Sequence, residues 1–260
     1  MATAANPKST DNVRAVERAI ELLQALNRSP ISTLGDLHRQ TGIPKSSIVR
    51  LLRALETQGL VTQTASYSAY RLREHVTSLS SGFAHQPRIV EAAETRMIAF
   101  TRREGWPLAL ALFDRGAMVV RASTIPYTTL APIQSSLEIR LSLVGYALGQ
   151  AYLAHLPSAE QKVLLQTART SPSLADRSAQ DVRGTQQMLK QVRERGYALR
   201  NQLFHSESST VAVPVFDRGR VAASLGLTWL AAAVPPHHVV ETYVPQLTAM
   251  AEGISRDLEA

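Results

Sequence analysis

The stretch PKSSIVRLLRALETQGLV, residues 44–61, is the feature that most restricts how this chain can fold. At about 100° per residue, a helix over this stretch separates its apolar side chains cleanly from its polar ones. The apolar face carries Ile48, Leu51, Leu52 and Leu55. Such a helix needs a small core of its own, and its polar face is left for solvent or for a partner.

Two further helices are predicted before this one. Residues 13–27 form one apolar face at spacings of three and four, and Thr33 is expected to cap a second helix, with Asp36 completing a capping box. Gly42 ends that helix, and the short turn 41–44 leads into the third. The apolar face of the first helix is expected to carry Val13, Val16, Ile20, Leu23 and Leu26.

Two short strands are predicted after Gly59. Leu60-Val61 and Tyr70-Arg71-Leu72 can pair around the polar loop 62–69. Three helices followed by such a ribbon indicate a winged helix-turn-helix over residues 13–73, behind a flexible tail over residues 1–12.

The remainder is predicted to be a linker helix over residues 74–87 and one mixed α/β domain over residues 88–260. Its strands pair around two Asp-Arg-Gly turns, at 114–116 and 217–219. Ser158 and Gln161 are expected to form a capping box, and Pro245 is expected to kink the last helix or to mark its start. The predicted helices span 88–104, 144–156 and 179–195, and a last helix follows Pro235-Pro236. The predicted strands span 106–113, 117–123, 209–216 and 221–229.

Composition excludes several classes of protein. Hydrophobic residues make up 45% of the 260, enough for a packed core, and the absence of cysteine excludes disulfides and thiolate chemistry. No apolar run is long enough for a transmembrane helix or a signal peptide, so we expect a cytoplasmic protein. The net charge is +7, and the first 85 residues hold 10 Lys and Arg against 6 Asp and Glu. That bias fits a polyanionic partner about as well as it fits simple solubility.

The third helix is the strongest functional signal. A recognition helix enters the major groove of DNA with its N-terminus first, where short hydrogen-bonding side chains and free backbone amides meet the nucleic acid. Helical arginines are more often merely solvated, and some winged helices bind proteins, but the complete pattern favours DNA. The candidate DNA-binding residues are Thr33, Pro44, Lys45, Ser46, Ser47, Arg50, Arg53, Tyr67 and Arg71.

Signals for an enzyme are weak. The nucleophile-elbow, zinc-protease and P-loop motifs are absent, and the adjacent His237 and His238 would point about 100° apart on a helix, which makes a shared metal a poor interpretation. His205 and Glu207 lie in a serine-rich stretch that reads as a loop. We therefore predict no catalytic residue, no metal and no cofactor.

The first 85 residues resemble the IclR family of bacterial transcriptional regulators, through VRAVERAIELLQAL and TLGDLHRQTGIPKSSIVRLLRALETQGLV. Weaker similarity continues in LSLVGYALGQAYLAHL, where Gln150 replaces the usual lysine, in VRERGYALR and in STVAVPVFDRGRVAASLGLT. The resemblance implies a GAF-like effector-binding domain with a mainly antiparallel sheet, and dimers or tetramers on palindromic operators.

The resemblance also implies where a small-molecule effector would bind. Several positions that are polar in the family are apolar or glycine here, which implies a larger or less polar ligand than a two- or three-carbon acid. The implied effector-binding residues are Ala147, Leu148, Arg200, Asn201, Thr210, Gly226 and Thr228.

The segments WPLALALFDRGAMVVRAST and LTWLA are most similar to the subgroup that controls breakdown of hydroxyphenylpropionate and related aromatic acids. The leading ligand hypothesis is therefore an aromatic carboxylate. Arg200 or Arg121 is a candidate to bind it, because a guanidinium binds a carboxylate with two parallel hydrogen bonds. For Arg121, the alternative is an outward-facing arginine on a strand.

Overall fold

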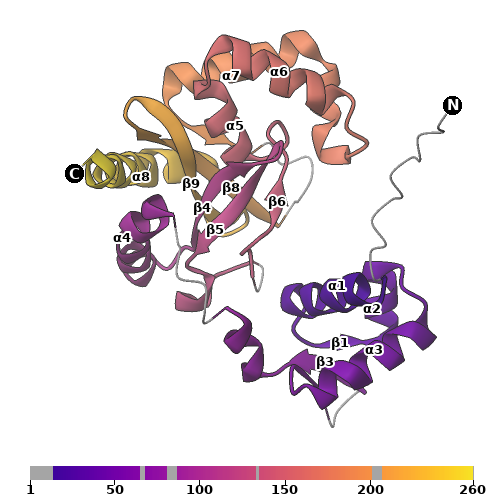
Figure 1. The fold of residues 1–260 in the computed structure, drawn as a ribbon. Coiled ribbons are helices and arrows are strands. Elements are labelled where there is room, and N and C mark those ends of the chain that lie inside the picture. Colours follow the sequence, from indigo (N-terminus) through magenta and orange to yellow (C-terminus); the bar gives the residue numbers. More distant parts are fainter. Residues whose placement is uncertain (1–13, 65–67, 81–86, 133–134, 201–206, 260) are drawn as a thin grey trace, which may run out of the picture. The chain divides into compact units, whose positions relative to one another are not determined.

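The computed structural model describes residues 14–64, 68–80, 87–132, 135–200 and 207–259 (Figure 1). The chain folds as two compact units, residues 1–84 and 85–260. Each unit has its own hydrophobic core.

The first unit contains three helices, α1 (Arg14–Arg28), α2 (Leu34–Thr41) and α3 (Lys45–Thr57). The predicted capping box of α2 is confirmed: Asp36 N–H donates to Thr33 Oγ1, and Thr33 N–H donates to Asp36 Oδ2 at 2.9 Å. The Thr33 hydroxyl also donates to Asp36 Oδ2 at 2.6 Å, and this bond, together with the one from the Thr33 N–H, lowers the pKa of the Asp36 carboxyl below its usual value. Gly42 ends α2 in the left-handed conformation that favours glycine, with φ of 66°.

The core of this unit is small and fully apolar. The face predicted for α3 supplies Ile48, Leu52 and Leu55, and Ile43 fills the turn before it. On α1 the prediction was partly wrong, because Val16 and Ile20 are 55% and 50% exposed, whereas Leu22, Ala25 and Leu26 are buried. The apolar residues of α1 therefore occupy two adjacent faces of the helix, and only the face with Leu22, Ala25 and Leu26 packs into the core of this unit.

The wing contains one more strand than predicted. β2 (Val61–Gln63) pairs with β3 (Ala69–Leu72) as expected, and β3 also pairs with β1 (Ser32–Thr33), which leads into α2. A two-residue strand has no sequence period, so only its partner reveals it. A 3₁₀ helix, η1, follows over Glu74–Leu79; the rest of the predicted linker, 81–86, lies outside the described residues.

The second unit is built on a six-stranded antiparallel sheet in the order β6-β5-β4-β9-β8-β7. The hairpins β4–β5 and β8–β9 turn at Arg115-Gly116 and Arg218-Gly219, all with positive φ, so both Asp-Arg-Gly turns form as predicted. The strands are β4 (Leu108–Asp114), β5 (Ala117–Ser123), β6 (Arg140–Leu141), β7 (Ala198–Leu199), β8 (Ser208–Asp217) and β9 (Arg220–Leu230).

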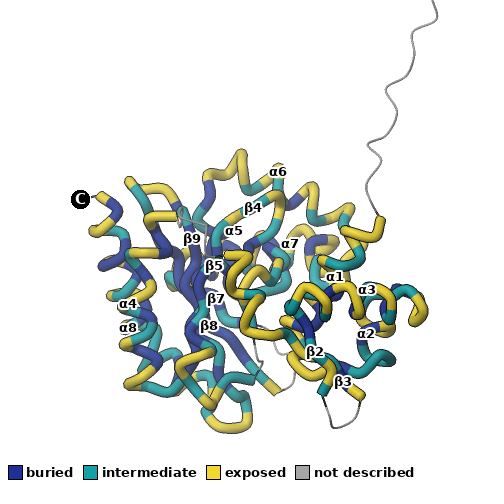
Figure 2. Tube along the Cα trace, turned by 60° about the horizontal axis from the view of Figure 1, so that its bottom comes forward, coloured by how far each residue is buried: buried dark blue, intermediate teal, exposed yellow. Residues whose placement is uncertain are grey.

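Helices cover both faces of this sheet, so its strands are buried between two helical layers (Figure 2). On β8 the side chains of Val211, Val213 and Val215 pack toward α4 and α8, whereas Ala212 packs toward α5. Thr210 shares the α5 face. One layer consists of α4 (Arg88–Glu104) and α8 (Pro236–Glu259), and the other of α5 (Ala147–His155), α6 (Ser158–Arg169) and α7 (Val182–Arg195).

Local expectations differ from the structure at two helix starts. Pro157 caps α6 without a side-chain hydrogen bond, and Gln161 instead donates to the carbonyl of Leu153 at 2.9 Å, so the predicted capping box at Ser158 was wrong. Pro245 lies inside α8 and does not begin it. Short 3₁₀ helices, η2 (Ile125–Tyr127) and η3 (Leu174–Gln180), complete the unit.

Candidate functional sites

The first candidate site is the polar face of α3. Lys45, Ser46, Arg50 and Arg53 are exposed along it, and Ser47 is half-buried. Within the part of the chain that the structure describes, Lys45, Arg50 and Arg53 form no ion pair, so their charge is available to an external anion. Pro44 caps the helix without a side-chain hydrogen bond, which leaves the first backbone amides of α3 free.

The remaining DNA-binding candidates lie on neighbouring elements. Thr33 is at the start of α2, where its hydroxyl is already bonded to Asp36. Arg71 is exposed on β3, opposite Thr62 of β2. Tyr67 falls in residues 65–67, outside the described residues.

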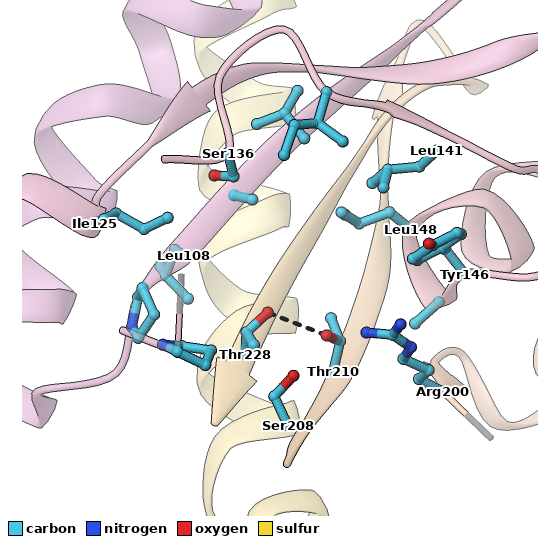
Figure 3. A pocket seen from close by; sticks show the side chains of 16 residues that line it. Leu108, Ile125, Ser136, Leu141, Tyr146, Leu148, Arg200, Ser208, Thr210 and Thr228 are labelled. Carbon is cyan, nitrogen blue, oxygen red and sulfur yellow. Dashed lines mark hydrogen bonds between the residues drawn. The ribbon is translucent and has the colours of Figure 1, made fainter. Parts of the chain in front are cut away.

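The second candidate site is a cavity of about 280 Å³ in the second unit (Figure 3). It lies on the α5 face of the sheet, and Pro132 and the segment 136–141 form one of its walls. Sixteen residues line it: Pro107, Leu108, Ala109, Val120, Ile125, Pro132, Ser136, Ile139, Leu141, Tyr146, Ala147, Leu148, Arg200, Ser208, Thr210 and Thr228.

Five of the seven residues predicted to bind an effector line this cavity: Ala147, Leu148, Arg200, Thr210 and Thr228. The register of β8 and β9 pairs Thr210 with Thr228, and their hydroxyls are 3.0 Å apart. Gly226 lies behind the wall, where an added Cβ would come within 2.9 Å of Leu148 Cδ2. Because Gly226 has no side chain, the Leu148 side chain can pack directly against its backbone. Asn201 lies outside the described residues.

The start of α5 shapes the cavity through its backbone. Gln150, at the position where the family usually has lysine, is 7% exposed and donates to the Val144 carbonyl at 2.7 Å. Gln150 therefore ties α5 to the turn before it and does not reach the cavity. Tyr146, which precedes α5, and Ser136 also line the cavity. Neither was predicted, because no sequence period distinguishes residues in a loop.

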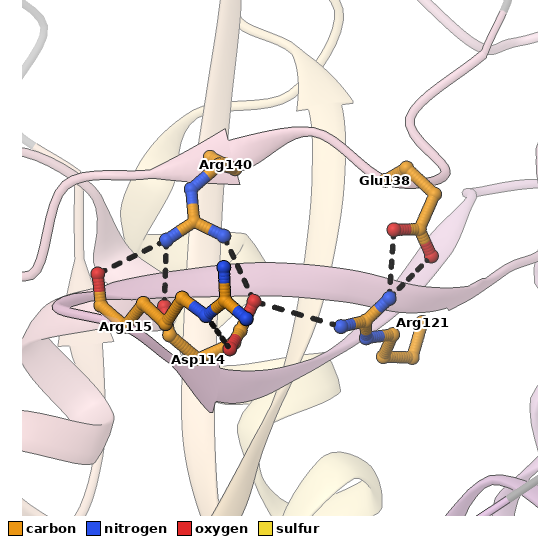
Figure 4. A network of polar contacts seen from close by, with 5 residues as sticks. All are labelled: Asp114, Arg115, Arg121, Glu138 and Arg140. Atoms are coloured by element: carbon orange, nitrogen blue, oxygen red, sulfur yellow. Dashed lines mark hydrogen bonds and ion pairs between the residues drawn. The ribbon is translucent and has the colours of Figure 1, made fainter. Parts of the chain in front are cut away.

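Arg121 is not among the residues that line the cavity, and acidic groups hold its side chain (Figure 4). It donates to both carboxylate oxygens of Glu138 at 2.7 Å and lies 3.8 Å from Asp114 Oδ2. Arg140 bonds the same Asp114 carboxylate at 2.9 Å and the carbonyl of Arg115 at 3.1 Å. Of the two arginines considered as carboxylate ligands, Arg121 is already paired.

These ion pairs fasten a strap, residues 136–141, to β5 through Arg121 and to the end of β4 through Asp114. Two backbone hydrogen bonds also join the strap to Val120: Glu138 N–H donates to the Val120 carbonyl at 2.9 Å, and Val120 N–H donates to the Ile139 carbonyl at 3.1 Å. The hydroxyls of Ser136 and Ser123 are hydrogen-bonded at 2.7 Å. Glu138 adopts φ of 61°, which is uncommon for a residue other than glycine. Since Ser136, Ile139 and Leu141 line the cavity, the strap is one of its walls.

We expect Glu138→Gln to loosen the strap, because the neutral amide cannot compensate Arg121 and the left-handed backbone stays strained. The loss is about 1 kcal/mol or less, since the pair is partly exposed. Hydrogen–deuterium exchange of the peptide covering residues 136–141 should become a few-fold faster, whereas Glu241→Gln, an exposed change on α8, should leave it unchanged. Unchanged exchange in Glu138→Gln would show that the backbone bonds alone hold the strap.

The described part of the chain holds no cluster of three His, Asp or Glu side chains suited to a metal ion, and none of its helices could cross a membrane. A winged helix-turn-helix with a basic recognition helix, in one chain with an α/β unit that contains a cavity, defines a ligand-responsive DNA-binding regulator.

Comparison with protein families identifies the class more closely. The model for the "IclR helix-turn-helix domain" matches residues 15–65, and that for "Bacterial transcriptional regulator IclR C-terminal" matches residues 83–256. The chain therefore belongs to the IclR family of bacterial transcriptional regulators, and it is a regulator, not an enzyme.

Relatives cover nearly the whole chain. The regulator XynR of Escherichia coli is 29% identical over 228 residues, which is 85% of this chain and 88% of XynR. KdgR of the same bacterium is 26% identical over 259 residues, 99% of this chain and 97% of KdgR.

Solved structures show the same fold. The IclR protein of Thermotoga maritima has a TM-score of 0.67 at 22% identity, covering 96% of this chain and all of that one. An IclR homologue from Microbacterium hydrocarbonoxydans, complexed with 4-hydroxybenzoate, has a TM-score of 0.64 at 19% identity, covering 94% of this chain and 99% of the homologue.

Proposed function

We propose that this regulator binds a roughly palindromic operator in the bacterial cytoplasm and that a small organic acid, with an aromatic carboxylate as the leading candidate, changes that binding. The genes under its control would then serve the breakdown of that acid. The observation that carries the proposal is a combination within one chain. Among the described residues, the basic side chains of α3 form no ion pair, and Arg200 is the one charged residue that lines the cavity.

The DNA-binding proposal assigns roles along α3. The exposed N-terminal residues Lys45 and Ser46 meet the DNA first, and Arg50 and Arg53 continue along the same groove-facing side. We assign Thr33 and Arg71, on the elements that flank this helix, to the phosphate backbone. Tyr67, which lies outside the described residues, is the DNA-binding residue proposed for the wing.

The aromatic-acid proposal has two supports. The lining of the cavity is mostly apolar, which suits a ring better than a polyhydroxylated acid. The Microbacterium homologue is complexed with 4-hydroxybenzoate, a compound of this class.

The test is titration of the purified protein against labelled DNA from upstream of its own gene, with and without 4-hydroxybenzoate. We expect binding to one fragment that falls steeply between about 50 and 200 mM salt, as phosphate contacts require. A folded protein that binds none of these fragments would refute the proposal. Weak, salt-insensitive binding would favour the alternative, a winged helix that binds proteins.

We also propose that the regulator is a homodimer, or a tetramer built from dimers, because a palindromic operator mirrors a two-fold axis in the protein. Support comes from α1, on which Val16 and Ile20 stand one turn apart and exposed. An apolar pair of this kind on a helix is typical of a buried contact with a second copy.

We expect Ile20→Glu to shift the protein toward monomers, because the new carboxylate would be buried at that contact without a partner. Light scattering after size exclusion measures the change directly. Gln40→Glu places the same charge on an exposed position of α2, away from this face of α1, and should leave the mass unchanged. A wild-type mass equal to one chain would contradict the dimer itself.

A further inference from the structure

Arg200 is a buried cation without a compensating anion. It follows β7, its backbone N–H donates to the Thr210 carbonyl at 2.9 Å, and the residue is only 9% exposed. Of the described residues that line the cavity, no other carries a charge. Burial is the main cause that lowers the pKa of Arg200 below its usual value, and an arginine guanidinium nevertheless stays protonated at neutral pH.

Two nitrogens of this guanidinium, Nε and Nη2, are buried and have no hydrogen-bond partner among the described residues. In a guanidinium these two N–H groups lie on the same edge and point in parallel. That edge matches the spacing of the two oxygens of a carboxylate. A buried charged donor left unpaired costs free energy, so the site favours a ligand that supplies the missing acceptors.

Tyr146 fixes the plane of this guanidinium. Its ring centroid lies 4.7 Å from Arg200 Cζ, within the range of a cation–π contact. A planar cation resting on a ring cannot rotate freely about its long axis, so the unpaired edge keeps one direction. In Figure 3 the guanidinium lies between Tyr146 and Thr210.

The rest of the cavity specifies the body of the ligand. The polar wall continues from Arg200 through Thr210 to Thr228 (Figure 3), whereas Leu108, Ile125 and the strap supply apolar surface. A ligand with a second anionic group would place that group against the apolar surface, where no described residue is cationic. A cationic ligand would be repelled by Arg200, and the described lining contains no acidic residue to compensate it. At about 280 Å³ the cavity is at the lower end of ligand sites, which run from roughly 300 to 1,000 Å³.

We propose that Arg200 binds the effector side-on, through Nε and Nη2, and that the effector is a monocarboxylate with a flat apolar body. Tyr146 acts as a positioning residue that holds the guanidinium. This inference rests on the proposed function and deepens it, because it names the ligand class and the atoms that recognise it.

Calorimetric titration of the full chain with 4-hydroxybenzoate and 3-phenylpropanoate, and with the primary amide of each, tests the ligand class. The amides keep the shape but lose the charge. We expect at least one acid to bind and its amide to bind at least tenfold more weakly. Equal affinity of acid and amide, or no binding by either acid at millimolar concentration, would overturn the inference.

Variants of Arg200 test the residue. In Arg200→Met the acid should lose at least thirtyfold in affinity, so that acid and amide bind equally weakly. Arg200→Lys keeps the charge but lacks the two parallel N–H groups, so its affinity for the acid should lie between those of wild type and Arg200→Met. Arg183→Met removes an exposed arginine from α7 and should change neither affinity. Retention of wild-type acid affinity by both Arg200 variants would exclude Arg200 as the anchor.

Variants of Tyr146 test the positioning role. Tyr146→Phe keeps the ring and should bind the acid like wild type, whereas Tyr146→Leu should bind it about tenfold more weakly, with the amide unaffected. An equal loss for acid and amide would show that Tyr146 merely shapes the wall. Operator binding without ligand is measured in parallel. Because Arg200 and Tyr146 lie in the second unit, a wild-type protein that binds its operator but binds neither acid would refute this inference alone and leave the DNA-binding proposal standing.

Discussion

Arg50→Ala is expected to weaken binding to the operator by about 5- to 150-fold, the equivalent of about 1–3 kcal/mol for one bidentate contact with a base. Arg50 is exposed on α3, four residues after Ser46, and forms no ion pair with a described residue. None of the described residues therefore compensates the guanidinium, and a guanine edge in the major groove presents two acceptors that match it.

The measurement is fluorescence anisotropy with the operator fragment and a random fragment of equal length, at one salt concentration. A base contact predicts a loss on the operator only, whereas an equal loss on both fragments would reassign Arg50 to the phosphates. Arg183→Ala removes the same charge from the second unit and serves as the control.

Gly149→Ala is expected to destabilise the second unit strongly. A Cβ at this position of α5 would lie 2.5 Å from Leu143 Cα, and closer still to the Ser142 carbonyl oxygen. Both are backbone atoms and cannot swing aside, so α5 or the turn before it must move. Overpacking of this kind costs about 1–3 kcal/mol or more. Ala147 and Leu148 line the cavity, so the shift should weaken effector binding as well.

Gly253→Ala in α8 is the matched control. Its added Cβ would lie 3.2 Å from Arg96 Nε and 3.8 Å from Arg256 Nη2, and both atoms belong to flexible side chains. Replacing a helical glycine with alanine stabilises a helix by up to about 1 kcal/mol, so this variant should be neutral or slightly more stable. Urea unfolding of both variants separates the effects. A Gly149→Ala protein as stable as wild type would show that the turn before α5 yields easily.

The helix-turn-helix could be predicted from the sequence because each of the signals that define it acts within a few residues. Thr33 and Asp36 cap α2 within one turn, Gly42 permits the left-handed end, and Ile48, Leu52 and Leu55 recur at the helical period. The two Asp-Arg-Gly turns were predictable for the same reason. The errors on α1 and at Ser158 arose where two local patterns compete and the tertiary partner chooses between them.

The sequence by itself determined the family, the order of the elements and the basic face of α3, because periodicity, caps and turns act over a few residues. Only the tertiary structure decided which arginine is free to bind a ligand. Arg121 and Arg200 look equivalent along the chain, yet Glu138 compensates the first, whereas the second is buried against Tyr146 with one edge unpaired. Burial and charge compensation depend on neighbours distant in sequence, and the fold alone brings those together.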